Sequence, residues 1–169
     1  FDDRTGVMFV GGFQHPPNID AVEYYAREIW PLLTELCPDL ETYIIGSRMP
    51  DRLKKLGESK GLKMLGFVED LTPYYESCKL AIAPLRYGAG VKGKVNQALS
   101  YGLPVVGSPD AFEGMGLTHE REVMVAETPE GFADSIAKVC NNCELWQALS
   151  EKGGASLAGR FTPEVAQEA

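Results

Sequence analysis

The sequence predicts an α/β fold, a doubly wound parallel sheet of about six strands with helices on both faces. Three observations lead to it. Short β-branched runs alternate with longer stretches of helical period. Several of these runs end at a glycine or proline, as buried strands do where a loop begins. The chain has 169 residues, 44% of them hydrophobic and 24% charged, which fits one domain with its own core.

The expected strands are short apolar runs, and the last of them reads as an edge strand. They lie at residues 7–10, 42–45, 62–67, 79–83, 104–107 and 122–125. Strands that alternate with helices favour parallel pairing, because a parallel neighbour needs a crossover connection. Ligands of such sheets bind at the carboxyl ends of the strands, at the topological switch point. The loops after Val10, Ile45, Phe67, Ala83 and Val106 are therefore where a site is expected.

The expected helices have apolar residues at intervals of three and four. Asn18 is a suitable N-cap for the first, and Pro31 should kink this helix or start a new segment. Thr72 and Pro73 read as the N-cap and first residue of a short helix. The expected helices lie at residues 18–36, 51–56, 72–76, 94–101, from 128 onward and at 145–157.

Charge and cysteine content exclude several classes of protein. Sixteen basic and 24 acidic residues give a net charge of −8, which argues against non-specific binding to nucleic acid or anionic lipid. No apolar run approaches the ~20 residues of a membrane span, and the start at Phe1 does not resemble a signal peptide. Four cysteines are few for a disulfide scaffold. We therefore expect a cytoplasmic protein whose phosphate-bearing ligands would need a local cluster of donors.

The segment 87–94 is the most informative for function. Its three glycines allow the backbone to approach a ligand, and the helix after it aims a partial positive charge at the same place. Lys92 and Lys94 add two cations, and Lys94, Gln97 and Tyr101 share one helix face. That face offers an ammonium near a phosphate and an amide at the distance of a ribose. Spacing alone leaves a flexible surface loop as an equal alternative.

Other sites are excluded or weakly indicated. Residues 11–17 contain no dinucleotide fingerprint, and the chain has neither a P-loop motif nor an Asp-x-Asp triplet for a metal–diphosphate complex. Cys140 and Cys143 have redox spacing but lie at a helix end, so two half-buried thiols are expected. His15, near the ligand edge, is either a structural loop residue or a residue that lines a cleft. His119 is expected to be a structural loop residue.

The order of these pieces resembles the C-terminal domain of the group 1 family of retaining, nucleotide-sugar-dependent glycosyltransferases, whose two-domain GT-B fold has Rossmann-like halves. The resemblance covers nearly the whole chain and is most specific at residues 83–106. It lies in residues 9–21, 29–33, 44–46, 66–71 and 83–106. It implies the donor-binding half of a metal-independent enzyme of polysaccharide or glycoconjugate biosynthesis, with residues 1–169 as one domain. An N-terminal acceptor-binding domain, through which any membrane contact would be made, is expected to be missing.

The resemblance also implies roles for ten residues. The diphosphate would be held by the backbone amides of Gly90 and Val91, by the helix N-terminus and by Lys92 or Lys94. The base would meet the backbone of residues 67–68, and the ribose would meet Gln97. The donor-binding residues expected in full are Gly12, Gly46, Arg48, Phe67, Val68, Gly90, Val91, Lys92, Lys94 and Gln97. No metal or cofactor is expected, and no catalytic residue is assigned.

Two positions depart from the family pattern and keep alternatives open. Many members carry two glutamates eight positions apart, where this chain has Ala89 and Gln97. Gln97 can bond a ribose hydroxyl without charge, whereas Ala89 cannot act as a carboxylate near the transferred sugar. The alternatives are a non-hydrolysing sugar-nucleotide epimerase of the same fold and a non-catalytic nucleotide-sugar-binding or scaffold domain. The chain alone is expected to bind donor weakly and to transfer nothing.

Overall fold

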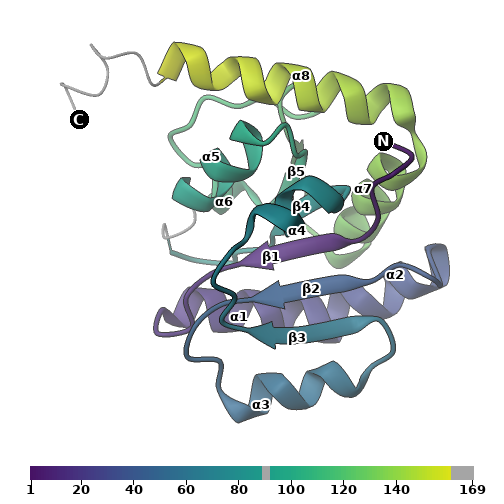
Figure 1. Cartoon of the computed structure of the whole chain (residues 1–169), viewed down its shortest axis with the longest axis vertical. Coiled ribbons are helices and arrows are strands. Elements are labelled where there is room, and N and C mark those ends of the chain that lie inside the picture. The colour runs from purple at the N-terminus through teal and green to yellow at the C-terminus, as the bar shows by residue number, and fades with distance from the viewer. Residues whose placement is uncertain (89–91, 161–169) are drawn as a thin grey trace.

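A computed structural model describes residues 1–88 and 92–160, the side chains of residues 92, 159 and 160 apart. Six parallel strands form one sheet in the order β3-β2-β1-β4-β5-β6 (Figure 1). The strands are β1 (Val7–Val10), β2 (Thr42–Ile45), β3 (Leu62–Gly66), β4 (Leu80–Ala83), β5 (Val105–Gly107) and β6 (Met124–Val125). The predicted fold class is confirmed. Because the order reverses between β1 and β4, the topological switch point lies between these strands.

Helices lie on both sides of the sheet. In Figure 1, α1, α2 and α7 lie behind the strands and α4 lies in front of them, while α5 packs on α8. The helical elements are α1 (Pro16–Tyr24), the π-turn η1 (Tyr25–Ile29), α2 (Trp30–Leu36), α3 (Asp51–Lys54), the 3₁₀ turn η2 (Lys55–Glu58), α4 (Thr72–Ser77), α5 (Lys92–Ser100), α6 (Pro109–Phe112), α7 (Pro129–Asn141) and α8 (Cys143–Arg160).

The first helix begins earlier than predicted. His15 is its N-cap and Pro16 its first residue, because proline presets the helical φ and lacks an N–H that the first turn would leave unpaired. Asn18 is therefore inside the helix and not its cap. Its side chain is buried, and Nδ2 donates to the carbonyl of Gly12 at 2.8 Å.

Smaller differences concern the other helix ends. Thr72 is the first residue of α4 and not its N-cap, and its N–H donates to Asp70 Oδ1 at 3.0 Å. Helix α5 begins at Lys92, two residues before the predicted start, and α8 extends beyond both predicted ends. The single-turn helix α6, which was not predicted, is capped by Ser108, whose Oγ accepts the N–H of Ala111.

Pro31 was predicted either to kink the first helix or to start a new segment, and the structure shows a new segment. Helix α1 runs into the π-turn, and α2 then begins at Trp30 with the proline in its first turn. The π-turn places Tyr25 in the core, where its hydroxyl and Thr42 Oγ1 are 2.7 Å apart. Burial raises the pKa of Tyr25 well above its ordinary value.

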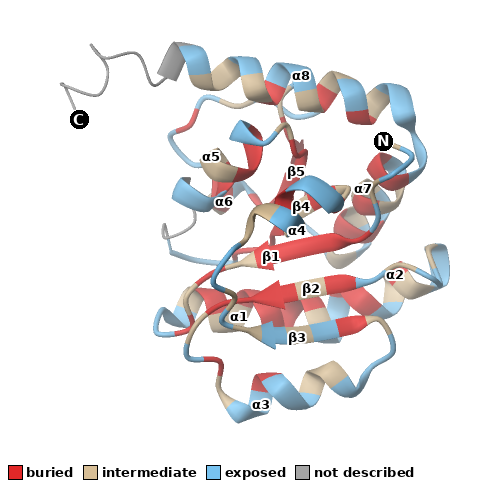
Figure 2. Ribbon diagram, in the orientation of Figure 1, coloured by how far each residue is buried: buried red, intermediate tan, exposed pale blue. Residues whose placement is uncertain are grey.

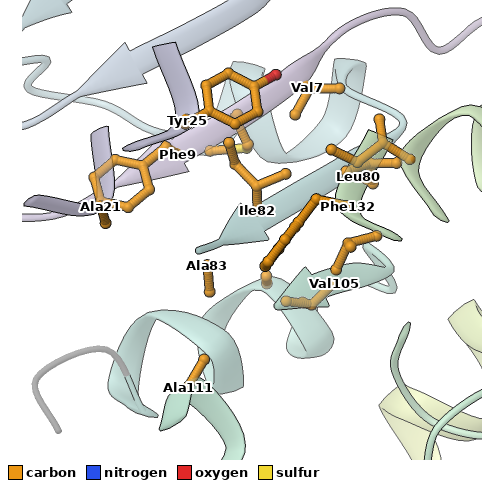
Figure 3. Packing of buried hydrophobic residues seen from close by; sticks show 14 of the residues in the cluster. Val7, Phe9, Ala21, Tyr25, Leu80, Ile82, Ala83, Val105, Ala111 and Phe132 are labelled. Atoms are coloured by element: carbon orange, nitrogen blue, oxygen red, sulfur yellow. The ribbon is translucent and has the colours of Figure 1, made fainter. Parts of the chain in front are cut away.

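The core follows the central strands. Buried residues concentrate on β1, β2, β4 and β5 and on the inward sides of the helices (Figure 2). Phe132 of α7 lies among Leu80, Ile82 and Val105 (Figure 3), and all four side chains are buried. Among the helices that the structure describes, none combines the length and apolar character of a membrane span.

Candidate functional site

A cavity of about 150 Å³ opens at the carboxyl ends of β1, β2 and β3. The residues that line it come from the loops after these strands and from the first turn of α5. They are Val10, Gly11, Gly12, Ile45, Gly46, Ser47, Phe67, Val68, Leu71 and Lys94. Five residues predicted from the sequence, Gly12, Gly46, Phe67, Val68 and Lys94, thus come together at the predicted edge of the sheet.

Gly46 allows two of these loops to approach each other. A Cβ atom at this position would overlap the carbonyl oxygen of Gly11. The amide of Gly46 donates to the carbonyl of Gly66 at 2.9 Å, and that of Gly11 donates to the carbonyl of Ile45 at 3.0 Å. The loops after β1, β2 and β3 are therefore held side by side by their backbones. Gly46 therefore contributes to the cavity by having no side chain, which lets the loops after β1 and β2 come into contact.

Two lining residues present unused backbone donors. Within the described chain, neither the N–H of Gly12 nor that of Val68 has a hydrogen-bond acceptor. The carbonyl of Gly12, which belongs to the next peptide, accepts from Asn18 Nδ2 and so fixes the chain directly after the free amide. Free amides beside a cavity suit a ligand rich in acceptor oxygens, such as a phosphate, a sugar or a base.

Lys94 supplies the positive charge of the cavity. It is exposed, stands in the first turn of α5 and lies where the helix carries partial positive charge. None of the ion pairs found in the described residues includes Lys94. In a chain of net charge −8, an uncompensated ammonium beside free amides is a site for an anion. The opposite face of α5, formed by Val95, Ala98 and Leu99, is buried as predicted.

Two further predicted residues, Arg48 and Gln97, do not line the cavity. Arg48 is exposed, takes a φ of 59° and does not line it. Gln97, one turn beyond Lys94, is half-buried and does not line it either. The backbone of Lys92 belongs to the first turn of α5. Gly90 and Val91 lie outside the described residues.

Five lining residues were not among the predicted site residues: Val10, Gly11, Ile45, Ser47 and Leu71. Ser47 and Leu71 both contribute to the cavity. The available signal was their position, since Ser47 directly follows Gly46 and Leu71 closes the loop that begins at Phe67. Neither side chain carries a motif by itself. Residues of this kind are found from the loops that contain them rather than from their own chemistry.

A larger hollow of about 490 Å³ lies at the opposite, amino edge of the sheet. Its cations are already engaged: Arg4 Nη1 donates to two backbone carbonyls at 2.8 and 3.0 Å, and Lys79 Nζ donates to the carbonyl of Cys140 at 2.9 Å. Asp39 and Glu41 add carboxylates to its lining. This hollow has the larger volume, but carboxylates line it and its two basic side chains already donate to backbone carbonyls. The chemistry favours the smaller cavity at the carboxyl edge.

The histidines and the paired thiols do not build a catalytic centre. His15 caps α1 without lining the cavity, and His119 Nδ1 accepts the N–H of Val125 at 2.9 Å, as a loop histidine does. Cys140 is buried, which raises its pKa to about 12, and Cys143 is exposed, so the pair is not the two half-buried thiols predicted. Within the described residues, no three His, Cys, Asp or Glu side chains gather as a metal site would require.

Comparison with known proteins supplies relatives for this arrangement. The family model "Glycosyl transferases group 1" matches residues 4–142. An uncharacterized 44.6 kDa protein in the cps region of Klebsiella pneumoniae is 28% identical over 147 residues, which are 82% of this chain and 38% of that protein. The chain thus spans well under half the length of this relative.

Solved structures share the fold. TarM of S. aureus, in a complex with UDP and sugar ligands, has a TM-score of 0.79 and 17% identity, over 98% of this chain and 34% of that one. The C-terminal domain of a glycosyl transferase group 1 family protein (LpcC) from Francisella tularensis has a TM-score of 0.72 and 13% identity, over 96% of this chain and 90% of that one. At such identities the structures establish the fold alone. Because the family model covers most of its length, the chain belongs to the Glycosyl transferases group 1 family.

Proposed function

We propose that the chain is the donor-binding half of a metal-independent retaining glycosyltransferase, which transfers a sugar from a nucleotide-sugar to an acceptor. One observation carries the proposal: the free ammonium of Lys94 and the free amides of Gly12 and Val68 meet at one cavity of the carboxyl edge. Family membership and the UDP bound to TarM support a nucleotide-sugar as the ligand.

The proposed roles follow the parts of a nucleotide-sugar. Lys94 and the first turn of α5, together with Gly90, Val91 and Lys92, would hold the diphosphate. When the bond between the sugar and the diphosphate breaks, negative charge grows on the leaving oxygen, and these donors would stabilise it. Residues 67–68 would meet the base, and Gln97 would meet the ribose. Arg48 is exposed and directly follows Ser47, which lines the cavity, and it would contact the diphosphate from the loop after β2.

The proposed partner is an N-terminal acceptor-binding domain supplied by a longer protein. The support is that the chain spans only 38% of the Klebsiella relative and 34% of TarM. We propose a polysaccharide or glycoconjugate as the acceptor. All four cysteines are free thiols, which supports a reducing compartment and therefore a cytoplasmic location.

Turnover by the longer protein separates the candidate functions. The protein would be incubated with a UDP-sugar and candidate acceptors, and the products would be resolved by mass spectrometry and NMR. Glycosyl transfer is the expected result. Epimerised donor would favour the epimerase, and donor bound without consumption would favour the non-catalytic domain, which Ala89 and Gln97 support by departing from the family pattern.

Thermal shift tests the binding half of the proposal on this chain. Nucleoside diphosphates, nucleosides and inorganic phosphate would be added separately. A ligand present at about one hundred times its Kd adds ~2.7 kcal/mol to the unfolding free energy, which raises the melting temperature measurably. A nucleoside diphosphate is expected to give the largest shift. No shift with any diphosphate would contradict the proposal.

A further inference from the structure

An ion pair joins the loop after β4 to α1, the helix that follows β1, across the switch point. Arg86 lies just after β4, and Asp20 lies in α1, the helix that follows β1. Arg86 Nε donates to Asp20 Oδ2 at 2.9 Å, and Nη2 donates to Oδ1 at 2.5 Å. A bidentate arginine–carboxylate pair fixes the orientation of both groups as well as their distance. The chain that leaves β4 is therefore bound to α1 with a defined geometry.

Further contacts of α1 and the π-turn hold the same guanidinium. Nη1 lies 3.7 Å from Glu28 Oε2, and the guanidinium lies over the ring of Tyr24, with Cζ 4.8 Å from the ring centre. The carboxylate of Asp20 raises the pKa of Arg86, with a smaller contribution from Glu28. The three groups around Arg86 all belong to one continuous helical segment. Arg86 is thus fixed against that segment as a whole.

The backbone next to Arg86 also packs on α1. Gly88 takes a φ of 86°, and a Cβ atom there would lie 2.5 Å from Pro17 Cγ. Only a glycine fits both the conformation and the space. Two positions of the loop after β4 are therefore matched to two positions of α1. This loop leads directly into the segment 87–94.

We propose that Arg86 and Asp20 are positioning residues for the diphosphate site. Their pair fixes the described part of the loop after β4, residues 84–88, against α1. The same helix holds Gly12 of the cavity through Asn18. The proposal rests on the proposed function. Arg86 does not line the cavity that contains Lys94, and its donors face carboxylates of α1 and the π-turn. Its role is therefore indirect. A preorganised site binds its ligand more tightly, because less order must be created on binding.

The test compares UDP with uridine, which lacks the diphosphate. Their Kd values would be measured by calorimetry for the wild-type chain and for Arg86→Gln, Asp20→Asn and the double variant. Arg86→Gln and Asp20→Asn are each expected to weaken UDP binding about tenfold, with uridine changed less than about twofold. Both substitutions remove the same ion pair. The double variant should therefore bind UDP no more weakly than the single variant with the lower affinity. Melting curves check that each variant is folded.

A matched control lies on the same helix. Arg52 of α3 pairs with Glu23 of α1 at 3.1 Å, so Arg52→Gln removes a comparable surface ion pair of the same helix and leaves the pair of Arg86 and Asp20 intact. It should leave the affinities for both ligands unchanged. Equal weakening of UDP and uridine by Arg86→Gln would show a purely structural role and overturn the proposal. Loss in Arg86→Gln with none in Asp20→Asn would overturn it too, because Arg86 would then contact UDP itself.

Lys94→Ala separates this proposal from the proposed function. If the wild-type chain binds UDP no more tightly than uridine, the diphosphate site is absent and both proposals fail. If the wild type prefers UDP and Lys94→Ala removes that preference, while Arg86→Gln and Asp20→Asn retain it, only the positioning role fails. Loss of the preference in all three variants, but not in Arg52→Gln, is the result that supports both.

Discussion

At the scale of single residues, the cavity depends on a glycine. Gly46→Ala places a methyl group on the carbonyl oxygen of Gly11, and backbone cannot move aside as a flexible side chain does. We expect a loss of about 3 kcal/mol or more in unfolding free energy, in the range of severe core substitutions. Gly93→Ala is the control, since no atom of the described residues lies near its Cβ position in α5, and alanine there should stabilise by ~0.5–1 kcal/mol. Urea denaturation of both variants decides the matter, and equal stabilities would refute the account of Gly46.

Two neighbouring residues of α5 test which side of the helix faces the ligand. Gln97 is half-buried and Ala98 is buried. Gln97→Glu should lower the melting temperature by only a few degrees and keep affinity for a ribonucleotide, because a carboxylate accepts strongly from hydroxyl groups. Ala98→Glu should unfold the domain, since an unpaired buried carboxylate costs several kcal/mol. If the two substitutions destabilise equally, Gln97 is a core amide and does not bind ribose.

At the scale of secondary-structure elements, one buried hydrogen bond connects the π-turn to β2. Tyr25 and Thr42 are both fully buried, with their hydroxyl oxygens 2.7 Å apart. Tyr25→Phe leaves the Thr42 hydroxyl without this partner and should cost ~1–3 kcal/mol. Adding Thr42→Val removes the unpaired group, so the double variant should regain part of that loss. Chemical denaturation of the single and double variants measures their unfolding free energies. Strictly additive losses would contradict the coupling between Tyr25 and Thr42.

The elements themselves were largely predictable, for a physical reason. Strand runs and helical periods are local in sequence, so all six strands were placed to within a few residues. The start of α1 was missed because Asn18 is a good cap by composition, whereas two prolines before it already suit a first helical turn. The single turn α6 is too short to show a period. Local conflicts of this kind are decided by tertiary contacts such as that of Asn18 with Gly12.

At the scale of the whole molecule, the position of the site was predictable and its construction was not. Alternating strands and helices predict a carboxyl edge, and the cavity lies there. By contrast, the pair of Arg86 and Asp20 joins residues 66 positions apart, which no local pattern reveals. The hollow at the amino edge, and the reason why its cations are unavailable, also depend on contacts distant in sequence.

We further expect UDP binding to need no divalent metal. The described residues hold no cluster of three or more metal-ligating side chains, and the sequence has no Asp-x-Asp triplet. Lys94 and backbone amides would carry the charge compensation that a metal supplies elsewhere. Excess EDTA should therefore leave the Kd for UDP unchanged in calorimetry. A fall in affinity of about tenfold, worth ~1.4 kcal/mol, would contradict this prediction.

The central claim is that the nucleotide binds at the carboxyl edge, although the larger hollow lies at the amino edge. The most direct measurement is a titration of UDP into the ¹⁵N-labelled chain, followed by the amide signals of both edges. We expect the largest shifts at Gly12, Val68 and Lys94, whose amides or side chains face the cavity, and no change at Gly6 and Asn141 of the amino-edge hollow. Shifts concentrated at Gly6 and Asn141 would contradict the account.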